Sequence, residues 1–326
     1  MHYRSDWPEV GWSTPLREQP LREQPPGRVA ASVDDHQAWA QETRFAGAVF
    51  RWIATHSEFE SQLYGLPIWN LRIEVDDPAG NLLTAGLDTP ALRQFVSERA
   101  CQLFDLSPWG GAYVSVKVVR DEPLYGALRQ LGYGKVEHRR IYACKVRDIV
   151  CGVSASAKSR IRFTSLAAVG PDRISAYREQ VLDICREAFE EKGHSRHFLD
   201  PVLLERSPGI AYILAVMALN FEHATPDHFL VANDVSSDRV CGFSVVGSKP
   251  GLEGDVYAQL LSAVRAAYRG QGIYRGLSHL LSRTLPQDAT LLNVTHVDNL
   301  AMQRAYRDSG RVHVADVVVL RRMYAR

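Results

Sequence analysis

Two stretches of the chain, about 178 residues apart, repeat one order of hydrophobic and polar positions. Each predicts a strand, a helix, a glycine and a second strand. The first series comprises 112–119, 123–131, Gly132 and 136–146, and the second comprises 290–295, 300–308, Gly310 and 312–320. Glycine directly after a helix suits a left-handed C-cap. We therefore predict two copies of one α/β unit; the alternative is coincidence, because this order is common in α/β proteins.

Further periodic segments fill the second half. Residues 175–191 place apolar side chains on one helical face, and 212–219 form an apolar helix. Strands are predicted over 228–233, 240–248 and 256–264. The longest apolar run, 209–219, is far shorter than the ~20 residues that cross a bilayer, so we expect a core helix there.

Length and composition are those of an ordinary globular protein. The 326 residues are about twice a usual domain, and 46% of them are hydrophobic. The 38 Lys and Arg nearly cancel the 37 Asp and Glu, so no global field would hold nucleic acid or a membrane. We predict a flexible proline-rich tail over 1–44, which could alternatively bind a partner that reads extended proline segments, and domains over 45–150 and 151–326.

The five cysteines include no CxxC pair and no histidine at ligand spacing. A zinc site or other metal site is therefore not expected, and free buried thiols in a reducing compartment are. The N-terminus has acidic residues and no apolar core of a signal peptide. We expect a cytoplasmic protein that does not bind membranes.

A glycine-bearing loop carries the clearest chemical signal. The strand over 256–264 runs into RGQGIYRG (269–276), after which an apolar helical stripe begins. Free backbone N–H groups and the positive end of a helix dipole make such a loop an anion site. Gly270 and Gly272 let the backbone approach a phosphate, while Arg269 and Arg275 add charge.

Other loops of this kind fit less well. The three glycines are spaced GxGxxxG, whereas the dinucleotide fingerprint is GxGxxG, and no acidic residue lies about twenty positions on. The Lys-Ser/Thr pair of a P-loop is absent. A tight strand-to-helix turn with surface arginines remains the alternative.

The segment resembles the GCN5-related N-acetyltransferase (GNAT) family. That family's acetyl-CoA loop reads Arg/Gln-x-x-Gly-x-Gly/Ala, and RGQGIY (269–274) matches it except at Tyr274, whose bulk would limit backbone approach. Asn299, Tyr306 and Gly310 resemble the family's helix beside the cofactor. The resemblance implies that acetyl-CoA contacts Val264, Arg269, Gly270, Gln271, Gly272, Ile273, Tyr274, Arg275 and Asn299, and that Tyr306 protonates the departing thiolate.

The resemblance also implies a fold. We expect tandem GNAT-like units, each a mixed, mostly antiparallel twisted sheet flanked by helices, with a degenerate first unit. Aligning Gly132 with Gly310 places Asp121 opposite Asn299 and Leu128 opposite Tyr306. Only the second copy therefore has the candidate site residues.

A narrower resemblance involves 59–65, 127–133 and 195–201, whose order is similar to that in bacterial dTDP-fucosamine acetyltransferases. It implies a nucleotide-linked amino sugar as the acceptor. It also places Arg196, His197 and Asp200 at the acceptor site; a solvated loop is the alternative.

The expected chemistry is direct attack of a neutral amine on the thioester, with backbone N–H groups of 260–263 stabilising the oxyanion. A Tyr of pKa ~10 can protonate a thiolate whose thiol has pKa ~8.5. Alternatively, Tyr306 only packs its ring, Asn299 only caps a helix, and His296 is structural or takes the amine proton through water. Another small amine, such as an antibiotic, polyamine or amino-acid-derived metabolite, a longer acyl chain, and a noncatalytic acyl-CoA-binding module are the alternative functions.

Overall fold

The computed structural model describes residues 30–33, 36–45, 48–76, 90–91, 94–96, 98–99, 111–120, 123–150, 160–190, 193–223, 226–249 and 255–324. The chain divides into two compact units, Met1–His138 with Asp316–Arg326 and Arg139–Ala315. We call these unit 1 and unit 2.

Unit 1 is built on a mixed sheet. Its strands are β1 (Ala30–Val33), β2 (His36–Phe45), β3 (Ala48–His56), β4 (Ile68–Asp76), β5 (Tyr113–Val119) and the later part of β12 (Val312–Met323), in this order across the sheet. Neighbours are antiparallel except β4 and β5, which are parallel. Helices α1 (Glu58–Tyr64) and α4 (Pro123–Gln130) follow β3 and β5, and Trp52, Val116 and Leu128 lie in its apolar core.

The tail predicted over 1–44 is too long. Strand β2 begins at His36 and pairs with β3 from Ala38↔Thr55 to Phe45↔Ala48. Most side chains of 40–45 are exposed, and Phe45, at the end of the strand, packs against the apolar core of unit 1. The hydrophobic pattern therefore gave no sign of it. Residues 1–29 lie outside the described part of the chain.

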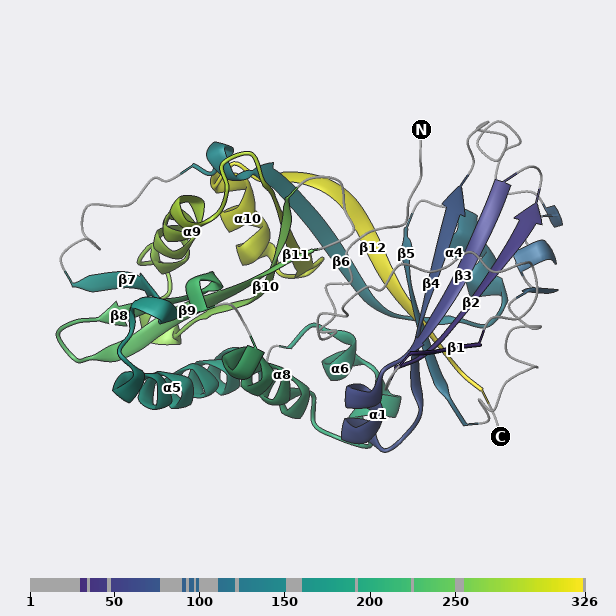
Figure 1. Ribbon diagram of the computed structural model, residues 1–326, viewed down its shortest axis with the longest axis horizontal. Coiled ribbons are helices and arrows are strands. Elements are labelled where there is room, and N and C mark those ends of the chain that lie inside the picture. Colours follow the sequence, from purple (N-terminus) through teal and green to yellow (C-terminus); the bar gives the residue numbers. More distant parts are fainter. Residues whose placement is uncertain are drawn as a thin grey trace. The chain divides into compact units, whose positions relative to one another are not determined.

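In unit 2, helices cover both faces of the strands (Figure 1). Its strands, in order across the sheet, are β6 (Gly134–Lys145), β11 (Thr290–His296), β10 (Val256–Val264), β9 (Arg239–Ser248), β8 (Phe229–Asp234) and β7 (Ile161–Ser165). Helices α5 (Pro171–Phe189) and α8 (Gly209–His223) cover one face, and α9 (Ile273–Thr284) and α10 (Leu300–Asp308) cover the other. The short helices α6 (Arg196–Leu199) and α7 (Pro201–Leu204) precede α8.

The predicted repeat of strand, helix, glycine and strand is confirmed in both copies. Gly132 and Gly310 are left-handed, with φ of 83° and 85°. The same hydrogen bond closes each helix, from the N–H of Tyr133 to the carbonyl of Leu128 and from the N–H of Arg311 to the carbonyl of Tyr306. The copies therefore end in one local geometry, although their side chains differ.

The last strand of each copy pairs outside its own copy. Strand β6 follows α4 in the first copy and pairs with β11, from Arg139↔His296 to Lys145↔Thr290. Strand β12 follows α10 and pairs with β5. The boundaries between unit 1 and unit 2 therefore fall inside β6 and β12. The domains predicted over 45–150 and 151–326 follow the sequence repeat instead.

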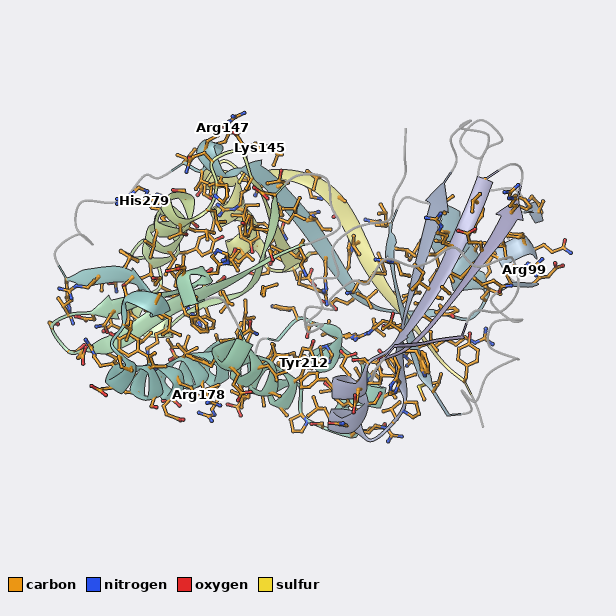
Figure 2. All side chains as sticks on the ribbon, viewed as in Figure 1. Arg99, Lys145, Arg147, Arg178, Tyr212 and His279 are labelled. Carbon is orange, nitrogen blue, oxygen red and sulfur yellow. The ribbon has the colours of Figure 1, made fainter. Side chains whose placement is uncertain are left out.

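Hydrogen bonds and an ion pair hold the end of β6 in unit 2. Lys145 donates hydrogen bonds to the carbonyl of Asp288 and the hydroxyl of Thr290, at 2.9 and 3.0 Å. Arg147 forms an ion pair with the Asp288 carboxylate, and Figure 2 shows Arg147 and Lys145 close together at this end of the strand. These contacts fix β6 against the turn that precedes β11.

Candidate functional site

The glycine loop lies between β10 and α9, after the 3-10 turn Ala266–Tyr268. Gly270 and Gly272 are left-handed, with φ of 77° and 79°, and the space around both Cα atoms is open. Within the described residues, the N–H groups of Gly270, Gln271 and Gly272 donate no hydrogen bond. Together with the first N–H groups of α9, they form a set of unsatisfied donors at a helix N-terminus.

Polar contacts hold the segment that leads into the loop. The Arg265 guanidinium donates to Glu187 on α5 and to the carbonyl of Val240, at 3.3 and 3.0 Å. The Tyr268 hydroxyl donates to Asp234 at the end of β8, at 2.8 Å. The start of the loop is therefore held without a ligand, which lowers the entropy that binding must overcome.

The charged and amide side chains of the loop lie at the surface. Arg269 donates through Nε to the carbonyl of Val264, and Gln271 donates to a carbonyl of the preceding turn. Arg275 lies 3.5 Å from Asp308 of α10 in a half-exposed ion pair. Both arginines thus border the open donors predicted to bind phosphate.

The last glycine of the GxGxxxG pattern has a packing role. A Cβ at Gly276 would overlap the ring of Phe163 on β7. Because α9 must approach the sheet closely there, this glycine is explained without any ligand.

Strands β10 and β11 separate beside the loop. They pair in parallel from Val256↔Thr290 to Gln259↔Asn293, and no later pair forms, although both strands continue. The register of β10 against β9 also shifts between Gln259 and Leu261, which marks a bulge. The backbone of 260–264 therefore has no β11 partner, so its hydrogen-bonding groups on that side are available to an extended ligand.

The first copy shares only part of this geometry. Strands β4 and β5 also pair over four residues, from Ile68↔Tyr113 to Leu71↔Val116. The register of β3 against β4, however, is continuous from Val49 to His56, so the first copy lacks the bulge. The loop after β4 lies outside the described residues.

Tyr306 lies where β10 and β11 diverge. Its side chain is buried, and its hydroxyl is 3.5 Å from the carbonyl of Val294, the first β11 residue beyond the paired stretch. Its ring contacts those of Tyr142 and Tyr274, with centroid distances of 5.3 and 6.0 Å. Burial is the main cause that raises the Tyr306 pKa well above its usual range, while Arg311 opposes the shift. The phenol therefore stays protonated at neutral pH.

Tyr274, where the sequence departs from the family pattern, points away from the glycine loop. Its hydroxyl donates a 3.0 Å hydrogen bond to the Gln259 side chain on β10, and burial raises its pKa. The side chain therefore lies between α9 and the sheet, and its bulk does not cover Gly270 or Gly272.

Arg311, which follows the C-cap glycine of α10, was not predicted as a site residue from the sequence. Its guanidinium is buried and donates to Asn293 Oδ1 at 2.7 Å, to the Ser309 hydroxyl, and to the Ser278 hydroxyl at 3.4 Å. In the described part of the chain, no carboxylate lies within ion-pair distance of it. The available signal was the repeat, because the equivalent residue of the first copy is the aromatic Tyr133.

Asn299 is the N-cap of α10, since its Oδ1 accepts from the Met302 N–H at 3.2 Å. The capping role is therefore confirmed, and its contact with the acyl donor stays a prediction. His296, at the end of β11, stacks on His194 with ring centroids 5.1 Å apart, and its Nδ1 lies 3.4 Å from Asp298.

The segment 196–200 is not a solvated loop. Arg196, His197 and Asp200 are all buried. The His197 ring stacks on Tyr212, labelled on α8 in Figure 2, with centroids 3.4 Å apart. The role of this segment at an acceptor site stays a prediction.

Among the described residues, no group of three or more His, Cys, Asp or Glu could hold a metal ion. Cys185 and Cys241 are free and buried, and desolvation raises their pKa values to about 12 and about 11. Cys144 is free and half-buried, while Cys101 and Cys151 lie outside the described residues. None of the described helices is long and apolar enough to span a membrane.

Comparison with known proteins reveals the fold. No protein-family model matches the chain, and no curated protein does. A tandem GNAT protein from the clavulanic acid biosynthesis pathway, solved without AcCoA, is 12% identical over 89% of this chain and 84% of its own, with a TM-score of 0.50. This chain has the tandem GNAT fold. GNAT proteins from Sphaerobacter thermophilus and Kribbella flavida are also similar, at 16% and 13% identity and TM-scores of 0.48 and 0.46. They cover 85% and 86% of this chain and 80% and 89% of their own.

The tandem GNAT fold confirms the predicted fold class. Each unit has a mixed, mostly antiparallel sheet with helices, and the parallel pair of each sheet lies next to the strand exchanged between the copies. At this identity the likeness concerns the fold, so the reaction must be argued from the residues.

Proposed function

We propose that the protein is an acetyl-CoA-dependent N-acetyltransferase that acts on a small amine. One observation carries the proposal. The N–H groups of Gly270 to Gly272, which donate to no described residue, follow a strand whose neighbour has diverged from it, and Tyr306 lies at the point of divergence. The tandem GNAT fold supports the same function.

The loop suits the diphosphate of the acyl donor. Donors at a helix N-terminus favour a negative group, and Arg269 and Arg275 add positive charge at its border. The unpaired edge of 260–264 suits the amide-bearing arm of the donor, which can hydrogen-bond as a strand does. Val264, Ile273 and Asn299 belong to the same proposed surface.

The chemical step is direct transfer. The lone pair of a neutral amine attacks the thioester carbon, and N–H groups of 260–263 stabilise the developing oxyanion. As the carbon–sulfur bond breaks, its electron pair goes to sulfur, and Tyr306 supplies the proton. His296, paired with Asp298, is the candidate that receives the amine proton through water.

The acceptor class is proposed from the narrower resemblance, as a nucleotide-linked amino sugar. The buried Arg196, His197 and Asp200 form an ordered segment that can help to shape such a site. Another small amine, such as an antibiotic, polyamine or amino-acid-derived metabolite, is the alternative acceptor.

A noncatalytic acyl-CoA-binding module is the second function. Its support in the sequence was Tyr274, whose bulk would disturb the loop. Because Tyr274 bonds to Gln259 inside unit 2, that support is removed.

A thiol-release assay tests the proposal. The protein is incubated with acetyl-CoA and a panel of amines that includes nucleotide-linked amino sugars, and free CoA is measured with and without each amine. We expect amine-dependent release from at least one member. Tight binding of acetyl-CoA without release from any amine favours the binding module, and no binding at all contradicts both functions.

A further inference from the structure

The residue that follows the C-cap glycine differs between the two copies. In the first copy, Tyr133 is buried in the apolar core of unit 1, and its hydroxyl lies 3.1 Å from that of Tyr324. In the second copy, Arg311 makes the same backbone hydrogen bond as Tyr133. The residue after the C-cap glycine is therefore a cation only in the copy that has the glycine loop and Tyr306.

Arg311 is surrounded by neutral groups. Its guanidinium bonds to Asn293, Ser309 and Ser278, and its central carbon lies 5.9 and 5.8 Å from the ring centroids of Tyr274 and Tyr306. Taking a cation out of water is unfavourable unless an anion or well-placed dipoles compensate for it. Ring faces and neutral oxygens compensate here, and no carboxylate among the described residues does.

We propose that Arg311 is a positioning residue that stabilises negative charge on Tyr306 when this tyrosine gives its proton to the leaving sulfur. The inference rests on the proposed function. When the carbon–sulfur bond breaks, sulfur receives the electron pair of that bond and the Tyr306 proton. Tyr306 is left as a phenolate, which regains a proton from water when the products leave.

The fold holds the cation beside this phenol. Arg311 Nε donates to Asn293 Oδ1 on β11, and the Tyr306 hydroxyl lies 3.5 Å from the carbonyl of the next residue, Val294. The guanidinium faces the Tyr306 ring, with its central carbon 5.8 Å from the ring centroid. This interaction becomes stronger when the ring carries negative charge, so Arg311 favours the state formed during transfer over the resting state.

The direction in which Arg311 shifts the Tyr306 pKa agrees with this role. Burial and Tyr274 raise the pKa of Tyr306, whereas Arg311 and Asn293 lower it. A buried phenol without this cation would be a still weaker acid, and a poorer match to the thiol that it must protonate. Arg311 thus offsets part of the disadvantage that burial imposes.

A double-mutant cycle tests the role in catalysis. In Arg311→Met, kcat should fall about tenfold or more, because one pKa unit corresponds to a factor of ten, while the Kd for CoA stays unchanged. In the Tyr306→Phe background, the same substitution should cause no further loss, and Arg311→Lys should restore part of kcat. Equal losses in both backgrounds would show that Arg311 acts only on the structure and would overturn the proposal.

A second measurement does not depend on enzymatic activity. Difluorotyrosine, whose phenol is more acidic, is incorporated at position 306, and its ionisation is followed by fluorine NMR. The midpoint should rise in Arg311→Met and much less in Arg311→Lys, because only the methionine variant lacks the cation. An unmoved midpoint would overturn the proposal even if the enzyme is active. A moved midpoint in a protein without transferase activity would support Arg311 and contradict only the proposed function.

Thermal denaturation of each variant checks the fold. If Arg311→Met does not fold, Arg311→Gln takes its place, because it keeps polar contacts with Asn293 and loses the charge. Arg311→Gln and Arg311→Lys are then compared in both the double-mutant cycle and the NMR titration.

Discussion

The hydroxyl of Tyr268 donates a 2.8 Å hydrogen bond to Oδ2 of Asp234. Asp234 ends β8, and its buried carboxylate also accepts from Arg160 and from the N–H and hydroxyl of Ser236. Tyr268 immediately precedes Arg269. One carboxylate at the end of a neighbouring strand therefore holds the start of the glycine loop.

This carboxylate should make stability depend on pH. Arg160 first, and then Ser236 and Tyr268, hold the Asp234 pKa well below its usual range against desolvation. A depressed pKa contributes stability above the unfolded-state pKa of about 4, and this contribution is lost as pH falls toward the folded-state value. Asp234→Asn should therefore be less stable than the wild type at pH 7, and the difference should shrink below about pH 4.

Chemical denaturation between pH 3 and pH 7 measures this difference. Asp288→Asn is the matched control, because its side chain pairs with Arg147 at the surface and is 85% exposed. Screening by solvent leaves such a pair little effect at any pH. A pH-independent difference for Asp234→Asn would contradict the role of its charge.

The left-handed backbone of Gly272 predicts a loss of both stability and binding. Alanine in this conformation costs roughly 1–2 kcal/mol, although the space around the Cα atom is open. Gly272→Ala should lower the free energy of unfolding by about that amount and weaken CoA binding in calorimetry. Gly126→Ala is the control. It lies in α4 with ordinary φ and open space, so it should stabilise the protein by roughly 0.5–1 kcal/mol. An undiminished affinity in Gly272→Ala would remove the loop from the donor site.

Loss of the Tyr306 hydroxyl should affect turnover far more than binding. Removing a general acid typically slows a reaction by ~10² to 10⁴, whereas the aromatic packing against Tyr142 and Tyr274 survives in phenylalanine. Tyr306→Phe should thus show a much lower kcat and a nearly unchanged Kd for acetyl-CoA. Turnover equal to that of the wild type would exclude Tyr306 from the mechanism.

The exchanged strands predict that the two halves of the chain need each other. A fragment of 151–326 lacks β6, which pairs with β11 and supplies Tyr142 beside Tyr306. A fragment of 1–150 lacks β12, the partner of β5. Each fragment alone should be unstable, and the two should copurify when they are coexpressed. A soluble, CoA-binding 151–326 fragment would show that β6 is dispensable.

The second copy was largely predictable because its chemistry lies in short contiguous motifs. Strand β10, the loop and α9 follow one another along the chain, so periodicity and glycine spacing located them. Gly132 and Gly310 were predictable for the same reason, since a helix ending in a left-handed glycine is a local event. Strand β2 was missed because the side chains of its residues 40–45 are mostly exposed.

The sequence by itself determined the repeated strand, helix, glycine and strand and the glycine loop between a strand and a helix, because each depends on conformational preferences within a few neighbouring positions. Only the tertiary structure decided which strands are exchanged, that Tyr274 bonds to Gln259, and that Arg311 lies against Tyr306 with no carboxylate of the described residues within ion-pair distance. Tyr274 and Gln259 are 15 positions apart, and the paired residues of β5 and β12 are about 200 positions apart. The pairing and burial that create these features depend on which surfaces meet when the whole chain packs.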